Sequence, residues 1–600
     1  MASPLLRLLP YHQRYGGAFW GGAAVLLLAR VCEALIPLFL RDSIDAIAAG
    51  RQQMAAGQID LATAQSALLV PTVAIALLVI ARFFCFDYAR RVIRRIANFI
   101  AYDLRKRVYS HLQLQGLAFF AVNPTGDLMA RAINDISLVR ELLGSGLRTL
   151  LVNGFLAIVG LTAMFWLAPT LTLLLLLPLP LIAALGWFAA RKVFARSLAV
   201  QEGFAALSAQ VQGNLQGIRT VQALVQEDNE IRRFDRCSDE YVAHFNALVR
   251  TNSFISALMP WLAAFATVII VGYGGSMVRD GAMSLGTFTA FFSYVGMVLW
   301  PVREIGSLVT LWQRGASGSR RLHEILDAEP EIADAPDPAA PRSILGHLQL
   351  SDLHYRYPRA GADALHGITL DIALGETIAI MGRVGSGKTT LLSMLVRLLD
   401  PPPGTLLIDG WDVRAFGLAQ LRQQVVLVPQ DPFLFAEVLR HNLSYDDPQR
   451  DEDLVWQAVD DASLMATVKS FAQALETPVG ERGVTLSGGQ KQRSTLARGL
   501  VRDAPVLVLD DCFSSVDTET EEHILERLFA ARRGRTTLLV TNRVSTARHA
   551  DRIVVLEAGR IVQVGAHAGL LQLPGWYADL DRIQRRRTQA GMALHAAGGG

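Results

Sequence analysis

The chain has 600 residues, of which 51% are hydrophobic and 18% are charged, and its formal net charge is +3. This length predicts more than one domain, and the small net charge gives no reason to expect a nucleic-acid-binding protein. The mean hydropathy of +0.30 lies on the apolar side of ordinary soluble proteins.

The apolar excess is confined to the first half of the chain, where it forms six long stretches. We expect membrane spans near residues 18–40, 66–88, 145–167, 170–190, 253–275 and 286–309. Each is close to the roughly 20 residues that a helix needs to cross a bilayer. A large soluble helical core is the alternative, but its apolar stretches would be shorter and amphipathic. The pattern therefore predicts a multi-pass transmembrane domain over residues 1–327, in the cell (inner) membrane.

The charged residues between these spans predict the orientation. The connection between the second and third spans contains Arg90, Arg91, Arg94, Arg95, Arg105, Lys106 and Arg107. The first connection offers only Arg41 and Arg51. By the positive-inside rule the basic connection is cytoplasmic, which places the N-terminus and the C-terminal half of the chain in the cytoplasm as well.

The segments outside the spans carry weaker signals. Residues 5–17 read as a short amphipathic helix on the membrane surface, and we expect no cleavable signal peptide. The long cytoplasmic connections, residues 89–141 and 191–252, read as helices with hairpin tips near residues 123–128 and 217–228. The four cysteines (Cys32, Cys85, Cys237 and Cys512) show neither a metal-binding spacing nor a disulfide framework.

A second domain follows the last span. Residues 328–345 form a linker rich in Pro, Ala and Asp, and we expect a nucleotide-binding domain over residues 346–584. Residues 585–600, which begin basic and end in three glycines, are predicted to be a flexible tail.

A phosphate-binding loop occurs early in this second domain. Residues 377–381 read as a buried strand, residues 382–389 (GRVGSGKT) as a glycine-rich turn, and residues 390–399 as an apolar helix. In this context backbone N–H groups and the helix N-terminus bind a phosphate. Lys388 would reach the β- and γ-phosphates of ATP, and the Thr389 hydroxyl would ligate Mg²⁺. Taken alone, the loop would also suit a kinase or another nucleotide hydrolase.

Residues 486–490 (LSGGQ) separate these alternatives, because with them the chain resembles the ATP-binding cassette (ABC) superfamily over essentially its whole length. The resemblance implies a six-span α-helical domain of the type I exporter fold, fused to an α/β P-loop ATPase domain. It also implies that the signature residues complete an ATP site on the opposite subunit. Residues 477–483 resemble a segment specific to exporters, residues 514–517 (SSVD) match the loop between the two ATP sites, and the hairpin tips resemble coupling helices.

The resemblance implies a set of ligand-binding residues. For ATP these are Tyr357, Gly382, Arg383, Val384, Gly385, Ser386, Gly387, Lys388, Thr389, Thr390, Ser487, Gly488, Gly489 and Gln490. For Mg²⁺ they are Thr389, Gln430 and Asp510, the last of which ends a buried strand at residues 507–510. Tyr357 matches the aromatic residue that stacks on adenine.

Two catalytic positions depart from the family pattern. Asp511 occupies the position of the glutamate that activates the attacking water, and Asn542 that of the histidine that contacts the γ-phosphate. Aspartate is one methylene shorter than glutamate, and a misplacement of about 1 Å can lower the rate about 100-fold. Asparagine donates a hydrogen bond but carries no positive charge. These changes predict a site that binds ATP and hydrolyses it slowly.

The loss is selective, since the phosphate loop and the signature are intact. This pattern resembles one subunit of heterodimeric bacterial exporters, and it predicts a partner half-transporter with Glu and His at the two positions. The alternatives are an active homodimer that tolerates both residues, such as a lipid flippase, and a nucleotide-gated channel or regulatory subunit. Appreciable ATPase activity of this chain alone would favour the homodimer, and a lack of transport against a gradient would favour the channel.

The sequence says little about the substrate. A hydrophobic or amphipathic drug or lipid is what the resemblance implies. Ionisable residues occur inside the predicted spans, namely Arg30, Glu33, Arg82, Arg303 and Glu304. We expect structural or interfacial roles for them, because Arg30 and Glu33 are one helical turn apart and long side chains near span ends reach the interface.

Overall fold

Long helices form the first unit of the computed structural model, which describes residues 4–177, 179–334, 343–358, 360–480, 483 and 485–597. This unit comprises residues 1–113 and 125–328. Its main helices are α1 (Leu9–Gln13), α2 (Gly16–Ala55), α3 (Leu61–Leu112), α5 (Thr125–Ala130), α6 (Ile136–Glu141), α7 (Leu147–Leu167), α8 (Pro169–Leu176), α9 (Leu179–Gln216), α10 (Ile218–Ala223), α11 (Glu227–Ile269), α12 (Gly275–Arg279) and α13 (Leu285–Leu326).

The described residues of the six predicted spans are helical, except Leu177. Among the described residues, three helical stretches are long and apolar enough to cross a membrane by length and composition alone: Gly16–Ala55, Leu61–Leu112 and Thr125–Leu167. The last three predicted spans each include residues or side chains outside the described part, and the side chain of Arg303 is one of these. The second span leaves its side chains exposed, as expected of a helix that faces lipid.

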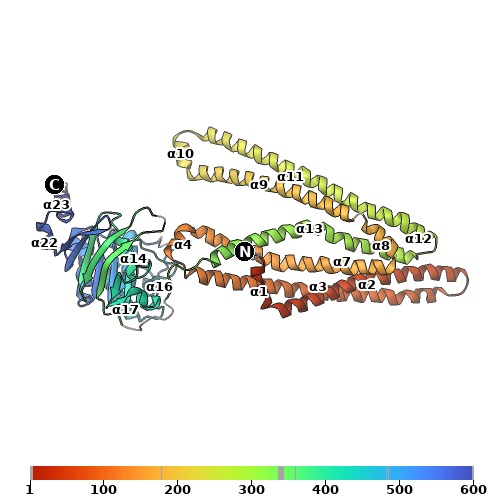
Figure 1. Ribbon diagram of the computed structural model, residues 1–600, viewed down its shortest axis with the longest axis horizontal. Coiled ribbons are helices and arrows are strands. Elements are labelled where there is room, and N and C mark those ends of the chain that lie inside the picture. The colour runs from red at the N-terminus through yellow and green to blue at the C-terminus, as the bar shows by residue number, and fades with distance from the viewer. Residues whose placement is uncertain are drawn as a thin grey trace. The chain divides into compact units, whose positions relative to one another are not determined.

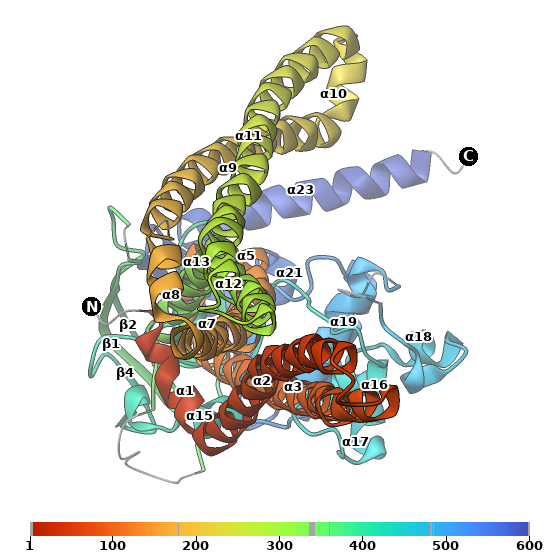
Figure 2. The ribbon, with the colours of Figure 1, turned by 90° about the vertical axis from the view of Figure 1, so that its right-hand side faces the viewer.

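Two hairpins dominate the helical unit. Helix α2 packs along α3, and α9 packs along α11 with α10 at their tip (Figure 1). The core lies between α2, α7, α8 and α13, where Leu171, Ile270, Phe291 and Tyr294 are buried. The α10 end of the second hairpin stands away from the other helices of this unit (Figures 1 and 2).

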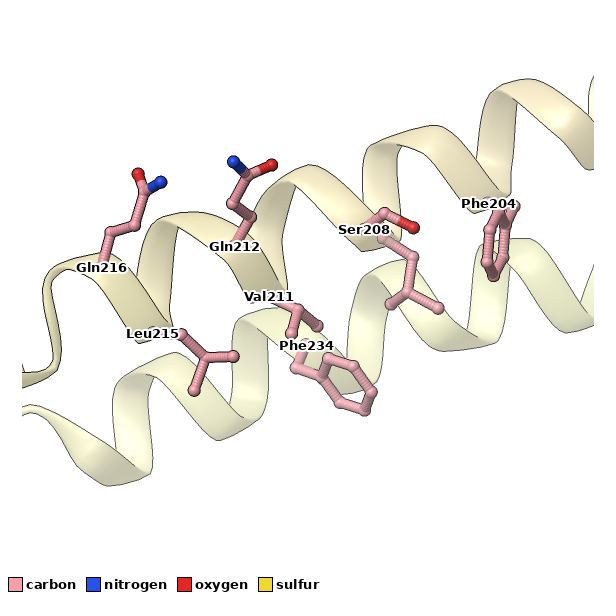
Figure 3. Close-up of a pocket in the computed structure, with 8 residues that line it drawn as sticks. Phe204, Ser208, Val211, Gln212, Leu215, Gln216 and Phe234 are labelled. Atoms are coloured by element: carbon pink, nitrogen blue, oxygen red, sulfur yellow. The ribbon is translucent and has the colours of Figure 1, made fainter. Parts of the chain in front are cut away.

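An apolar groove runs along the second hairpin, with a volume of about 680 Å³. Side chains of α9 and α11 line it, among them Phe204, Val211, Leu215 and Phe234 (Figure 3). The exposed fractions of Leu215 and Phe204 are 67% and 57%. This part of the hairpin lies beyond the predicted spans, so lipid does not account for its apolar surface.

The second unit comprises residues 114–124, which include the tip helix α4 (Leu117–Val122), and residues 329–600. A six-stranded sheet has the order β10-β9-β3-β8-β7-β6, and a four-stranded antiparallel sheet has the order β2-β1-β4-β5. The strands are β1 (Leu348–Tyr355), β2 (Leu365–Ile372), β3 (Thr377–Gly382), β4 (Leu406–Ile408), β5 (Trp411–Asp412), β6 (Val425–Val428), β7 (Val506–Asp510), β8 (Thr536–Val540), β9 (Arg552–Glu557) and β10 (Arg560–Gly565).

The other helices of this unit are α14 (Lys388–Leu395), α15 (Leu418–Gln424), α16 (Leu439–Leu443), α17 (Glu452–Asp461), α18 (Met465–Ser470), α19 (Gly488–Leu500), α20 (Thr518–Ala531), α21 (Val544–Ala547), α22 (His567–Gln572) and α23 (Trp576–Ala597). Strands β3, β7 and β8 are buried almost throughout, which explains their continuous apolar runs. Separate hydrophobic clusters form on α14 and on α17, α19 and α20.

The C-terminal segment differs from the sequence-based expectation. Residues 585–600 were expected to be flexible, but α23 continues through Ala597, and residues 598–600 lie outside the described part (Figure 2). Its residues are mostly strong helix formers, and Arg585 pairs with Asp581 one turn earlier at 2.7 Å. The four cysteines are free.

Candidate nucleotide-binding site

The predicted phosphate and catalytic residues share one edge of the six-stranded sheet. Strands β3, β6, β7 and β8 are parallel, so their carboxyl ends meet at this edge. The phosphate loop follows β3, and Gln430 follows β6. Asp510 ends β7 and Asp511 comes directly after it, while Asn542 follows β8. In open α/β sheets ligands bind outside the carboxyl ends of such strands.

The phosphate loop has the backbone geometry that its glycines predict. A Cβ on Gly382 would lie 2.2 Å from the carbonyl oxygen of Leu556, and one on Gly387 would lie 2.7 Å from that of Ala364. Both glycines also have positive φ angles, 152° and 98°. Gly387 caps the N-terminus of α14, where unpaired N–H groups favour an anion. The loop thus fits the phosphates of ATP.

Lys388 folds over this loop. Its Nζ donates hydrogen bonds to the carbonyl oxygens of Gly382 and Arg383 at 2.7 and 2.9 Å. Burial lowers the pKa of Lys388, while the carboxylates of Asp510 and Asp511 act in the opposite direction. The lysine therefore lies close to both carboxylates at the end of β7.

The Thr389 side chain lies close to Asp510, so two of the three predicted magnesium ligands are neighbours. Burial raises the pKa of Asp510, and the nearby Thr389 side chain opposes this shift. Gln430 is exposed on the loop after β6, next to Asp431, whose charge also acts on Asp510. A hydroxyl, a carboxylate and an amide oxygen are ligands that suit Mg²⁺.

Asp511 and Asn542 follow the neighbouring strands β7 and β8. The N–H of Asp511 donates to the carbonyl oxygen of Val540 at 3.0 Å, and Asp511 has a positive φ of 43°. Burial raises the pKa of Asp511, and the charges of Arg543 and Lys388 counteract it. Asp511 therefore lies near Lys388 of the phosphate loop, and Asn542 follows the neighbouring strand β8.

The predicted adenine-stacking residue also lies near this loop. The hydroxyl of Tyr357 is 3.0 Å from Oγ1 of Thr390, on the first turn of α14. The tyrosine ring is 40% exposed and packs edge-on against Tyr355 at a centroid distance of 5.2 Å. Val384 and Arg383 lie on the loop itself, where Val384 is 97% exposed.

The signature residues form a capped helix start of their own. Ser487 accepts a hydrogen bond from the N–H of Gln490 at 3.3 Å, and Gln490 Oε1 accepts from the N–H of Ser487 at 2.9 Å. A Cβ on Gly489 would lie 2.9 Å from the carbonyl oxygen of Ser515. Gln492 bonds Ser514 and Ser515 at 2.8 Å each. Within the described residues, the signature contacts this 514–515 loop and not the phosphate loop.

Three residues that hold the site together were not predicted. Arg543 pairs with the buried Glu521 and donates to the carbonyl oxygens of Val516 and Ser514 at 3.3 Å. Gln584 on α23 bonds the backbone of both Asn542 and Val544. In the sequence, Glu521 lies in an acidic run that is typical of a solvated helix face. The only signal for Arg543 is its position directly after Asn542.

The exporter-type segment at residues 477–483 is described only in part. Residues 477–480 and Gly483 are described, and Glu481 and Arg482 lie outside the described residues. Val438 and Pro478 form an isolated antiparallel bridge, which ties this segment to the start of α16.

Comparisons with known proteins agree with this arrangement. Residues 19–302 match the family described as ABC transporter transmembrane region, and residues 365–514 match the family described as ABC transporter. The chain is 34% identical to the probable multidrug resistance ABC transporter ATP-binding/permease protein YheI of Bacillus subtilis, covering 80% of this chain and 83% of that protein. It is 33% identical to the ATP-dependent lipid A-core flippase of Syntrophus aciditrophicus, covering 83% and 82%.

A solved structure of a bacterial Atm1-family ABC exporter with ATP bound has the same fold, with a TM-score of 0.77. The likeness covers 95% of this chain and 98% of the other at 24% sequence identity. At this identity the comparison concerns the fold alone.

Proposed function

This chain belongs to the ABC transporter family, as an exporter-type ATPase with a multi-pass membrane domain, and from that premise we propose the finer function. It is one subunit of a heterodimeric exporter that moves hydrophobic or amphipathic compounds out of the cytoplasm or the inner leaflet. Its own ATP site is slow, and its signature completes the active site of the partner. The nucleotide-binding domain faces the cytoplasm.

The observation that carries this proposal is the combination of Asp511 and Asn542 with an otherwise complete site. The phosphate loop keeps its glycine geometry, Thr389 lies close to Asp510, and the signature is capped at Ser487. General decay would not spare these parts and change only the two residues that act on water and the γ-phosphate. A site of this kind retains ATP, while hydrolysis occurs where the partner supplies Glu and His.

The need for a second subunit has independent support in the α9–α11 hairpin. Its groove exposes Phe204, Leu215 and Phe234 beyond the predicted spans. Monomeric proteins rarely leave a long apolar surface in water, and such surfaces mark interfaces. A second half-transporter is the partner that fits this surface.

The substrate class rests on the relatives. One carries multidrug resistance in its name, and another is named a lipid A-core flippase. We extend this to a drug-like or lipid-like substrate for the present chain. Closure of two nucleotide-binding domains on ATP would move the coupling segments near α4 and α10 and open the membrane domain outward.

The experiment that tests the proposal is purification of the tagged chain from its native host in mild detergent. We expect a stoichiometric second half-transporter and ATPase activity. Changing the catalytic Glu of the partner should abolish this activity, whereas Asp511→Asn in this chain should only reduce it. An active assembly that contains this chain alone would show that Asp511 and Asn542 are working residues and would overturn the heterodimer.

A further inference from the structure

A polar cavity of about 760 Å³ lies within the helical unit, between α3, the α6–α7 segment and α13. Its charged lining residues are Arg90, Arg94, Arg140, Arg148, Arg314 and Glu141. These residues come from segments far apart in the sequence. All of them lie at or near the same ends of the second, third and sixth predicted spans, the ends for which the sequence predicts the cytoplasmic side.

The charge in this cavity is not balanced. Five arginines face one glutamate, and within the described part of the chain none of the five arginines forms an ion pair. Arg90 and Arg94 lie near enough to Arg148 for their charges to act on it. Elsewhere in the same unit arginines do have partners, as where Arg321 bonds Asp135 at 2.8 Å.

Clustered like charges repel one another, and a cleft lined by charges of one sign raises the local concentration of counter-ions. An anion entering the cavity would relieve that repulsion. Guanidinium groups bind phosphate in a bidentate geometry that an ammonium group does not offer, and all five cationic residues here are arginines.

We propose that this cavity binds a phosphate-type anion, carried by the transported compound or by a lipid headgroup at the cytoplasmic end of the spans. The inference rests on the proposed exporter function and narrows its substrate class to acidic amphiphiles. The arginines hold the headgroup, and an acyl chain attached to it extends along the apolar spans that begin beside the cavity.

Helix α3 offers a matched control for this site. Arg90 and Arg94 line the cavity, whereas Arg91 pairs with Asp87 at 2.6 Å and Arg95 stacks over the ring of Phe99. The double variants Arg90→Gln/Arg94→Gln and Arg91→Gln/Arg95→Gln therefore remove the same charge from the same helix. Only the first removes it from the cavity.

The test measures binding of radiolabelled dodecyl phosphate to the complete transporter in phosphatidylcholine nanodiscs. We expect Arg90→Gln/Arg94→Gln to weaken binding about tenfold or more, since each lost charge-assisted contact contributes appreciably. Arg91→Gln/Arg95→Gln should stay within about twofold of the wild type, a change of about 0.4 kcal/mol or less. Dodecyl trimethylammonium should not compete.

Competition distinguishes the two sources of the anion. Displacement by glycerol 3-phosphate indicates a water-soluble phosphate, whereas displacement only by phosphatidylglycerol in the nanodisc indicates a lipid headgroup. Either result supports the site. Equal losses in both double variants would show a general surface effect and overturn it.

Two other results would also overturn the site. If Arg90→Gln/Arg94→Gln separates the subunits on size exclusion, the arginines serve assembly instead. If the wild type does not bind dodecyl phosphate but still binds ATP and hydrolyses it, the cavity has no such role and the exporter proposal stands. Loss of ATP binding in the wild type would instead contradict the exporter proposal itself.

Discussion

Gln584 holds the backbone of Asn542, because its Nε2 donates a hydrogen bond to the Asn542 carbonyl oxygen at 2.8 Å. The same side chain accepts a hydrogen bond from the N–H of Val544 at 2.9 Å. The C-terminal helix α23 thereby fixes the loop that follows β8 and adjoins the ATP site. A residue near the end of the chain, far from every family motif, positions the altered switch residue.

Loss of this contact should loosen the loop. Gln584→Leu removes both hydrogen bonds, each of which contributes about 1 kcal/mol. We expect amide hydrogen exchange at Val544 and its neighbours to become about tenfold faster, since local opening becomes easier. Arg582→Ala is the control, because Arg582 pairs with Asp579 on the exposed face of the same helix. Equal exchange in both variants would show that α23 does not hold the loop.

Restoring the family residues at the two altered catalytic positions should raise the rate of ATP hydrolysis. We expect Asp511→Glu/Asn542→His to raise hydrolysis at this chain's own site by about 10- to 100-fold, because the glutamate reaches about 1 Å further. The measurement is ATPase activity in a complex whose partner carries Gln at its catalytic Glu, which silences the other site. Adding Lys388→Ala to the double variant should abolish the gain. No gain in the double variant would mean that Asp511 already works at full rate.

Nucleotide binding should depend on Lys388. Lys388→Ala removes a cation that lies over the phosphate loop, and a charge-assisted hydrogen bond contributes about 1.5 to 3 kcal/mol. We expect ATP affinity to fall about 10- to 100-fold, as measured with a fluorescent ATP analogue on the full-length protein. Lys469→Ala, at the exposed end of α18, should leave the affinity unchanged.

The sequence predicts the parts of this molecule that local patterns encode. The continuous apolar runs of β3, β7 and β8 and the glycines of the phosphate loop mark the sheet edge where Asp510, Asp511 and Asn542 meet. Contacts between distant segments leave no such pattern. Gln584 reads as one polar residue at the end of the predicted domain, just before the basic tail. Glu521 reads as solvated, although it is 2% exposed and pairs with Arg543. Likewise, Arg90 and Arg94 are informative in the sequence only about topology, and helix packing makes them part of a cavity.

The signature glycines should differ in their tolerance of a methyl group. A Cβ on Gly489 would lie 2.9 Å from the Ser515 carbonyl oxygen, whereas one on Gly488 would meet its nearest atom at an ordinary 3.8 Å. We expect Gly489→Ala to destabilise the protein by about 1 to 3 kcal/mol through overpacking. Gly488→Ala should have little effect. The two variants are compared by thermal unfolding of the full-length chain, followed by tryptophan fluorescence. Equal melting temperatures would show that the 514–515 loop moves to accommodate the added methyl group.

Three of the charged residues inside the predicted spans form a cluster. Glu33 pairs with Arg30 one turn away on α2, and its other oxygen lies 3.1 Å from Arg82 on α3. The exposed fractions of the Arg30, Glu33 and Arg82 side chains are 6%, 17% and 41%. The pairing of Arg30 with Glu33 that the sequence suggested is therefore present, and Arg82 joins it.

This cluster predicts an asymmetry among three variants. Glu33→Gln leaves the buried Arg30 without its counter-charge, which should cost about 3 to 5 kcal/mol of stability. Arg82→Gln keeps the inner pair, so it should cost less stability than Glu33→Gln. Arg30→Gln/Glu33→Gln removes both buried charges together and should be more stable than Glu33→Gln alone. Thermal unfolding in detergent ranks the three variants by their melting temperatures. If Glu33→Gln and Arg82→Gln were equally mild, the cluster would be solvated, and a role in a polar pathway through the membrane would replace the structural one.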